Sequence, residues 1–326
     1  MKQFFHGARL TDAHSTALTL KQRVMEPDQM LVGVGYSLGA IVLNNYVASY
    51  GEGTALDAAV SISGSLNCHF QSIFQRSQRT WQPMIAAFMK DELLLRKWGR
   101  RIQKRLGPDG FRAFLRAFNV VVRTLCSGFQ KYTAHDVPIA SNTLGFSPIL
   151  YYFQEVDRHA SLAYNFGPNS DLDHFYAEMS VLGDIAIDQL DRLTPQDVSD
   201  KKIANIAIPM LVVQALDDPV STWRNVAANH GLMHPDNLVR TGQGNLVVLL
   251  TQKGGHVGWP LGWWPSKNKW KFMSDAAAGF VNAVYEIRQQ QQQFKLLDDL
   301  NSHDDEECLA QANHTVCSHE AKEPHP

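Results

Sequence analysis

The sequence lacks several features that would place it in a specialised class of protein. Its four cysteines have no spacing typical of a metal site, and two of them lie in a polar terminal segment. No apolar run reaches ~18 residues, the length that a membrane-spanning helix needs. The first residues form too short and too polar a stretch for a signal peptide. These absences predict a cytoplasmic protein with free thiols, although a longer form could be membrane-anchored.

A strong charge of one sign is also missing. The net charge is −2, which argues against a nucleic-acid partner. A hydrophobic content of 44% over 326 residues is enough for a full buried core. A basic stretch at residues 90–105 could contact anionic lipid headgroups, but a solvated helix face is the favoured interpretation. We therefore expect a globular protein, with peripheral membrane contact as an open alternative.

The most informative stretch is a glycine-rich turn between two apolar segments. A short apolar run at residues 30–34, typical of a buried strand, leads into Gly-Tyr-Ser-Leu-Gly at residues 35–39, which fits G-x-S-x-G. An amphipathic helix is expected from residue 38 to about residue 50. Strand, sharp turn and helix is the context of a nucleophile elbow, in which a strained backbone lifts the Ser37 hydroxyl above a sheet. Side chains two residues before and after Ser37 are expected to clash. The alternative is a plain turn with a surface serine.

Apolar segments on both sides of a long helical block indicate the fold class. Strands are expected at residues 56–63, 208–215 and 246–251, and a terminal helix at residues 271–288. Strand followed by helix and strand predicts parallel pairing, so the fold class is α/β, with a mostly parallel sheet and a large helical cap insertion. The expected parts are a first section of the core with the elbow at 1–65, the helical cap at 66–207, a second section of the core at 208–288, and a disordered tail rich in glutamine, acidic residues and histidine at 289–326.

A serine nucleophile needs a base and an orienting carboxylate, and the sequence offers both in order. Asp218 and His256 each follow an apolar strand, so both are expected at the same edge of the sheet as Ser37. Asp217 competes with Asp218 for the role of acid. The Pro219 that directly follows Asp218 favours Asp218, and Asp217 is expected to cap the loop or face solvent. Each residue alone is common in such loops, but the joint order predicts a Ser-Asp-His triad.

At this point the chain resembles the α/β-hydrolases, in particular the YheT-like branch that includes the ABHD esterases. The segments that carry the resemblance are residues 33–40, 208–219 and 255–259, with Phe175, Tyr176 and Trp270. The resemblance implies a serine esterase that acts on carboxylic esters, including lipid esters and acylglycerols, without a metal or organic cofactor. It also implies that Ser37 is the nucleophile, Asp218 the acid and His256 the general base, with the Leu38 backbone N–H as an oxyanion donor.

The chain departs from this family before the elbow. Only 36 residues precede Ser37, so the family's earlier strands and the loop that donates a second oxyanion N–H are expected to be missing. His6-Gly7 superficially resembles that loop, but no strand precedes it. We therefore expect an N-terminally truncated form whose elbow strand has an exposed edge and favours self-association. The alternative function is a catalytically impaired remnant that binds lipid or a protein partner.

Four tryptophans after His256 add a second feature that could touch substrate or membrane. They are Trp259, Trp263, Trp264 and Trp270. An acyl pocket or a membrane surface would account for the cluster. Packing of the loop against the cap is the favoured interpretation.

Overall fold

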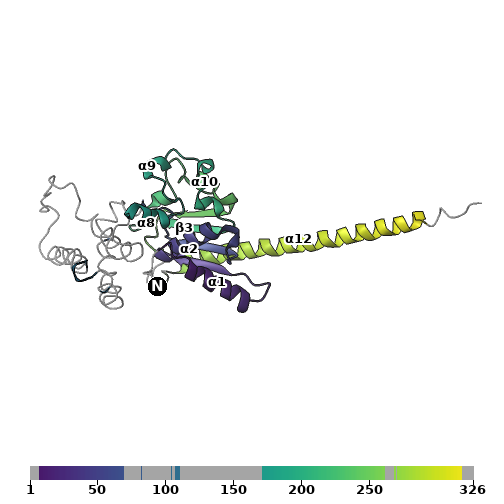
Figure 1. The fold of residues 1–326 in the computed structure, drawn as a ribbon. Coiled ribbons are helices and arrows are strands. Elements are labelled where there is room, and N and C mark those ends of the chain that lie inside the picture. Colours follow the sequence, from purple (N-terminus) through teal and green to yellow (C-terminus); the bar gives the residue numbers. More distant parts are fainter. Residues whose placement is uncertain are drawn as a thin grey trace, which may run out of the picture. The chain divides into compact units, whose positions relative to one another are not determined.

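The computed structural model describes residues 7–69, 82, 104, 107–110, 171–260, 268 and 270–317 (Figure 1). The chain divides into two compact units, Met1–Ala277 and Ala278–Pro326, which are described separately. The first unit contains the sheet and the candidate site. The second consists, in its described part, of helix alone.

The first unit is built on a four-stranded sheet in which all neighbouring strands are parallel. Its strands lie in the order in which they occur along the chain, and they are β1 (Val32–Tyr36), β2 (Ala58–Ile62), β3 (Met210–Ala215) and β4 (Leu246–Thr251). The two central strands, β2 and β3, are buried along their whole length, as expected for strands covered on both faces. The α/β class, the parallel sheet and all four predicted strands are confirmed, with shifts of one or two residues at some ends.

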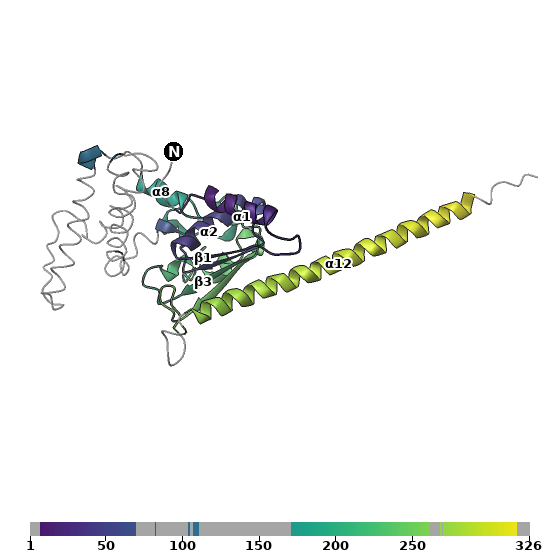
Figure 2. The ribbon, with the colours of Figure 1, turned by 90° about the horizontal axis from the view of Figure 1, so that it is seen from below.

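Helices α1 (Thr11–Arg23) and α2 (Leu38–Tyr50) cover one face of this sheet (Figure 2). Ala17 of α1 and Leu43 and Val47 of α2 belong to one apolar core together with Met210 and Val212 of β3. The α2 helix has the predicted bounds. It ends at Gly51, whose φ of 52° is the left-handed conformation that glycine adopts easily at a helix C-terminus.

The approach of α2 to β1 depends on the absence of a side chain at Gly35. A Cβ atom there would lie 2.7 Å from both the Ala40 Cα and the Gly39 carbonyl oxygen. These are backbone atoms at the start of α2 and cannot move aside without shifting the helix. A Cβ at Gly39, in contrast, would meet no atom of the described residues within 4 Å outside the backbone of its own helix. Among the described residues, the expected clash is therefore confirmed before Ser37 and wrong after it.

The β1 strand is an edge strand among the strands that the structure describes, where its one partner is β2. Gly33 and Gly35 face α2, so Val34 and Tyr36 lie on the opposite face of the strand. They are 45% and 42% exposed. The expectation of an apolar edge at the elbow strand is confirmed for the described residues, and self-association along that edge is still a prediction.

The predicted cap at 66–207 is described only near its two ends. The middle of this expected helical block, residues 70–170, lies outside the described residues, apart from isolated positions. The described elements are α8 (Leu172–Glu178), α9 (Ile187–Leu190) and the short 3-10 helices Pro195–Val198 and Lys202–Asn205. Val181, Leu182 and Ile203 are fully buried in the same core as α2 and β3. This last part of the expected cap therefore packs as part of the same core as the sheet.

Helix α12 (Lys271–Cys317) corrects the expected C-terminal boundary. The sequence predicted a helix that ends at residue 288 and a disordered tail from 289, but the helix continues to Cys317. Residues 280–317 contain neither glycine nor proline, and they include many glutamine, leucine, alanine and glutamate residues, which favour helix. Low apolar content argues against a packed core, but it does not prevent a helix from forming. The α12 helix is long enough to cross a bilayer but too polar. None of the described helices is both long enough and apolar enough to span a membrane.

The two elbow glycines give a matched test of this packing. Gly35→Ala should lower the free energy of unfolding by about 1–3 kcal/mol, because a methyl group is forced into backbone atoms. Gly39→Ala should leave it unchanged or raise it by up to about 1 kcal/mol, because alanine favours helix and its methyl group meets open space. Urea unfolding followed by circular dichroism measures both. Equal losses in the two variants would contradict the packing described here.

Candidate active site

Ser37 occupies a strained turn between the end of β1 and the start of α2. Its φ of 51° and ψ of −118° lie in a region of backbone conformation that residues other than glycine rarely adopt. The turn is held at both ends, because the Ser37 N–H donates to the Ile62 carbonyl at 2.9 Å, and the Ser37 carbonyl accepts from the Ala40 N–H at 3.0 Å. The predicted strand, turn and helix around Ser37 are thus present in the structure. Strain of this kind is typical of functional positions.

The structure brings the three predicted side chains into one hydrogen-bonded chain. The His256 Nε2 atom lies 2.8 Å from the Ser37 Oγ atom, and the His256 Nδ1 atom lies 2.9 Å from Asp218 Oδ2 and 3.1 Å from Asp218 Oδ1. The Asp218 side chain is completely buried, and that of His256 is 20% exposed. A base that is reachable from solvent and rests on a buried carboxylate suits proton transfer to and from a substrate.

The buried Asp218 carboxylate is fixed by four donors. Its Oδ1 atom accepts hydrogen bonds from the backbone N–H groups of Val220 at 2.8 Å and Ser221 at 2.9 Å. Its Oδ2 atom accepts one from Gln214 Nε2 at 3.2 Å, and His256 Nδ1 completes the set. These contacts leave the carboxylate little freedom to rotate, so the imidazole is oriented by a rigid partner.

Gln214 is a site residue that the sequence analysis missed. It is the last residue but one of β3 and is completely buried. A glutamine inside an otherwise apolar strand needs a polar partner, and here the partner is Asp218. That isolated polar residue is the signal from which its role could have been inferred.

Asp217, the competing candidate for the acid, was expected to cap the loop or face solvent, and the structure places it in an exposed loop contact. Its Oδ1 atom accepts a hydrogen bond from the Gly255 N–H at 2.8 Å, in an exposed position. Gly255 has a φ of 63°, which allows the turn just before His256. Asp217 thus ties the loop after β3 to the loop that carries His256, whereas Asp218 binds the imidazole itself.

Trp259 packs beneath the His256 loop. It is 3% exposed, and its Nε1 atom donates to Thr251 Oγ1 at 2.8 Å. Its ring stacks on Phe272, with 5.7 Å between the ring centroids. Trp259 is therefore packed in its loop, as the sequence analysis favoured, but these partners belong to β4 and α12 and not to the expected cap. Trp270 is 51% exposed, and Trp263 and Trp264 lie outside the described residues.

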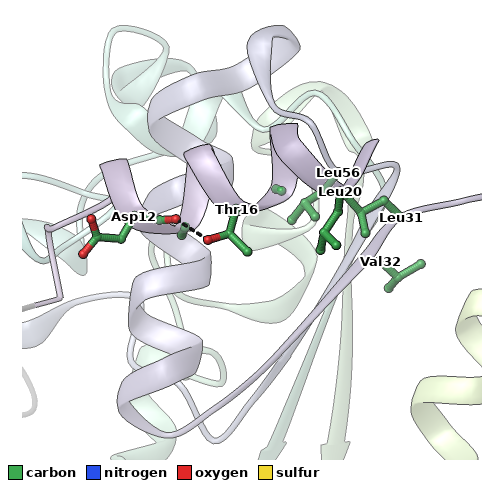
Figure 3. A pocket seen from close by; sticks show the side chains of 8 residues that line it. Asp12, Thr16, Leu20, Leu31, Val32 and Leu56 are labelled. Carbon is green, nitrogen blue, oxygen red and sulfur yellow. Dashed lines mark hydrogen bonds between the residues drawn. The ribbon is translucent and has the colours of Figure 1, made fainter. Parts of the chain in front are cut away.

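A pocket of about 390 Å³ lies away from this triad, between α1 and the beginnings of β1 and β2 (Figure 3). Leu20, Leu31, Val32 and Leu56 line it, and the Thr16 hydroxyl beside it donates to the Asp12 carbonyl at 2.7 Å. Val32 begins β1 and Ser37 follows the end of that strand, so about 16 Å of extended chain separates them. This pocket is therefore not an acyl pocket for Ser37.

The described residues contain no group of three or more histidine, cysteine, aspartate or glutamate side chains that could hold a metal ion. The chemistry available at this edge of the sheet is that of a serine hydroxyl, an imidazole and a carboxylate. These groups in this order can transfer an acyl group to the serine and then to water.

Comparison with known proteins adds little to this geometry. No family model and no curated protein matches the chain. Two solved structures of an epoxide hydrolase from Bacillus megaterium are similar to it, one with a bound inhibitor at 12% identity and one of a single-residue mutant at 13% identity. Each has a TM-score of 0.28 and covers 76% of this chain and 68% of the other. Similarity this low does not identify an activity, so the evidence for one lies in the side chains around Ser37.

Proposed function

We propose that this chain is a serine hydrolase that cleaves carboxylic esters through an acyl-enzyme formed on Ser37. His256 acts as the general base and Asp218 as the orienting acid. The observation that supports this most strongly is the hydrogen-bonded chain from Asp218 through His256 to Ser37, placed at a strained strand-to-helix turn. Structural serines rarely combine a left-handed backbone with a partly exposed histidine at 2.8 Å.

The reaction follows from the positions of these groups. Because His256 Nδ1 faces the Asp218 carboxylate, the proton of the neutral imidazole is assigned to Nδ1, which leaves the Nε2 lone pair facing Ser37. Nε2 takes the hydroxyl proton as Ser37 Oγ attacks the ester carbonyl. The tetrahedral intermediate then expels the alcohol, which receives that proton from His256. In the second half, His256 takes a proton from a water molecule as its oxygen attacks the acyl carbonyl. The bond between Ser37 Oγ and the acyl carbon then breaks, Ser37 Oγ takes that proton back from His256, and the carboxylic acid is released.

The oxyanion of each tetrahedral intermediate would sit near the start of α2. Leu38 is the first residue of this helix, and the first N–H groups of a helix have no acceptor within it. The positive end of the helix dipole favours negative charge at the same place. We therefore assign the Leu38 backbone N–H as an oxyanion donor.

The proposed family is the α/β-hydrolases, and the proposed branch is the YheT-like esterases, with small-molecule or lipid esters as substrates. A parallel sheet with the elbow after one strand, and the acid and base after two later ones, fits this family.

A second candidate function is an impaired form that binds lipid or protein. It is favoured by one observation, the position of β1 at the edge of the described sheet, where the family's fold has a further strand. In the family a loop before the elbow donates the second oxyanion N–H, and a form without that donor would have a rate lower by about 10²–10³-fold.

A fluorophosphonate probe tests the nucleophile. The probe should label the wild-type chain, because it reacts with a serine activated by a neighbouring histidine, and Ser37→Ala should abolish labelling. In-gel fluorescence measures both, and peptide mass spectrometry locates the modified residue. Equal labelling of the two proteins would show that another serine reacts. Absence of labelling in the wild type would favour the impaired form.

The two neighbouring aspartates test the acid. Asp218→Asn should lower the hydrolysis of p-nitrophenyl butyrate by about 10³–10⁴-fold, because the imidazole loses the carboxylate that fixes its tautomer. Asp217→Asn should cost less than about tenfold, because its side-chain carbonyl can still accept the Gly255 N–H. Steady-state kinetics at neutral pH compare them. The reverse ranking would identify Asp217 as the acid.

A further inference from the structure

Two buried serines, Ser63 and Ser221, lie behind the triad and take no part in the reaction proposed above. Ser63 directly follows β2 and is completely buried, and its N–H donates to the Val213 carbonyl at 2.9 Å. Ser221 lies three residues after Asp218 and is 4% exposed. One serine therefore ends the strand next to the elbow strand, and the other belongs to the loop that carries the acid.

Three hydrogen bonds connect these serines to both partners of the imidazole–carboxylate pair. The Ser221 N–H donates to Asp218 Oδ1 at 2.9 Å, and the Ser221 hydroxyl donates to the Ser63 carbonyl at 2.9 Å. The Ser63 hydroxyl in turn accepts the N–H of Val257 at 3.3 Å. Val257 directly follows His256. The two serines thus form a bridge from the acid loop, across the end of β2, to the loop of the base.

The backbone is strained at two residues of this bridge, and the hydrogen bonds of the bridge help to hold that strained conformation. Ser63 has a φ of 52° and Val257 a φ of 54°. A left-handed conformation is especially unfavourable for a β-branched residue such as valine, and it persists only where surrounding contacts compensate for it. The hydrogen bond from the Val257 N–H to Ser63 Oγ is one such contact, and it acts at the residue next to His256.

We propose that Ser63 and Ser221 are positioning residues that set the alignment of His256 between Asp218 and Ser37. This inference rests on the proposed function, because it assigns the two hydroxyls a part in the same site. Neither hydroxyl contacts Ser37 or the imidazole in the described hydrogen bonds. Their effect is carried by the Asp218 turn and by the Val257 backbone. Displacement of a catalytic group by about 1 Å can cost on the order of 100-fold in rate, so loss of the bridge has a measurable effect.

Four single variants of the full chain separate the hydroxyl groups from folding. Ser63→Ala and Ser221→Ala each remove one hydroxyl. Ser63→Gly removes the same hydroxyl and also relieves the strain of the left-handed backbone. Ser221→Thr keeps a hydroxyl at position 221 and is the matched control for Ser221→Ala. For each variant, the kinetics of fluorophosphonate labelling at Ser37 give kinact and Ki, and thermal unfolding gives Tm.

We expect kinact to fall about tenfold or more in Ser63→Ala, Ser63→Gly and Ser221→Ala, with Ki within about twofold of the wild type. Ser221→Thr should retain most of the wild-type kinact, and Ser63→Gly should have a Tm no lower than that of Ser63→Ala. A residue that only supports folding would change Tm and kinact together, whereas a positioning residue changes kinact in the Ser63→Gly chain without a matching loss of Tm.

Three results would overturn this inference and leave the proposed function in place. They are wild-type kinact values in Ser63→Gly and Ser221→Ala, an equal loss in Ser221→Thr and Ser221→Ala, or a change in Ki with kinact unchanged. A wild-type chain that the probe does not label at Ser37 overturns the inference together with the proposed function.

Discussion

The parallel alignment of β1, β3 and β4 is the constraint on which the rest of the site depends. Carboxyl ends of parallel strands lie at one edge of a sheet, and residues far apart in the sequence meet there. Ser37 follows β1, Asp218 follows β3 and His256 follows β4. No local interaction could bring these three together, because the Ser37–His256 contact joins positions 219 residues apart. The sheet therefore has to form before the triad has any geometry.

Strained backbone is concentrated at this same edge. Five residues other than glycine have a positive φ among the described positions, and four of them, Ser37, Ser63, Val257 and Trp259, lie in the elbow, at the end of β2 or in the His256 loop. Each conformation of this kind costs of order 1–3 kcal/mol. The buried core under α2 and the hydrogen bonds around Asp218 offset that cost. Strain at the site is thus supported by stability elsewhere in the first unit.

Much of this arrangement could be predicted because it is encoded locally. The elbow, its helix and the four strands follow from short apolar runs and glycine positions, and Pro219 correctly favoured Asp218 over Asp217 as the partner of the imidazole. The Ser63–Ser221 bridge was missed because two of its hydrogen bonds join segments distant in sequence. Gln214 was missed for another reason, since its bond to Asp218 spans only four residues and depends on the turn after β3. The clash expected for a side chain at Gly39 was wrong, because the G-x-S-x-G motif does not show which of its two glycines lies close to other atoms.

The length of α12 was missed for a different reason. Its second half has too few apolar residues to build a core, and low apolar content predicts disorder when burial alone is considered. Helix formation depends on backbone preference as well as on burial, and residues 289–317 contain no helix breaker.

The acyl-enzyme on Ser37 is the intermediate that the proposed reaction requires and that a non-catalytic binding protein would not form. Brief reaction of the wild-type chain with p-nitrophenyl butyrate, an acid quench and peptide mass spectrometry would detect it. The account predicts a butyryl group on Ser37 that is present at early times, disappears as the ester is consumed, and is absent from His256→Ala. Ester turnover without acylation of Ser37, or a butyryl group on another residue, would contradict it.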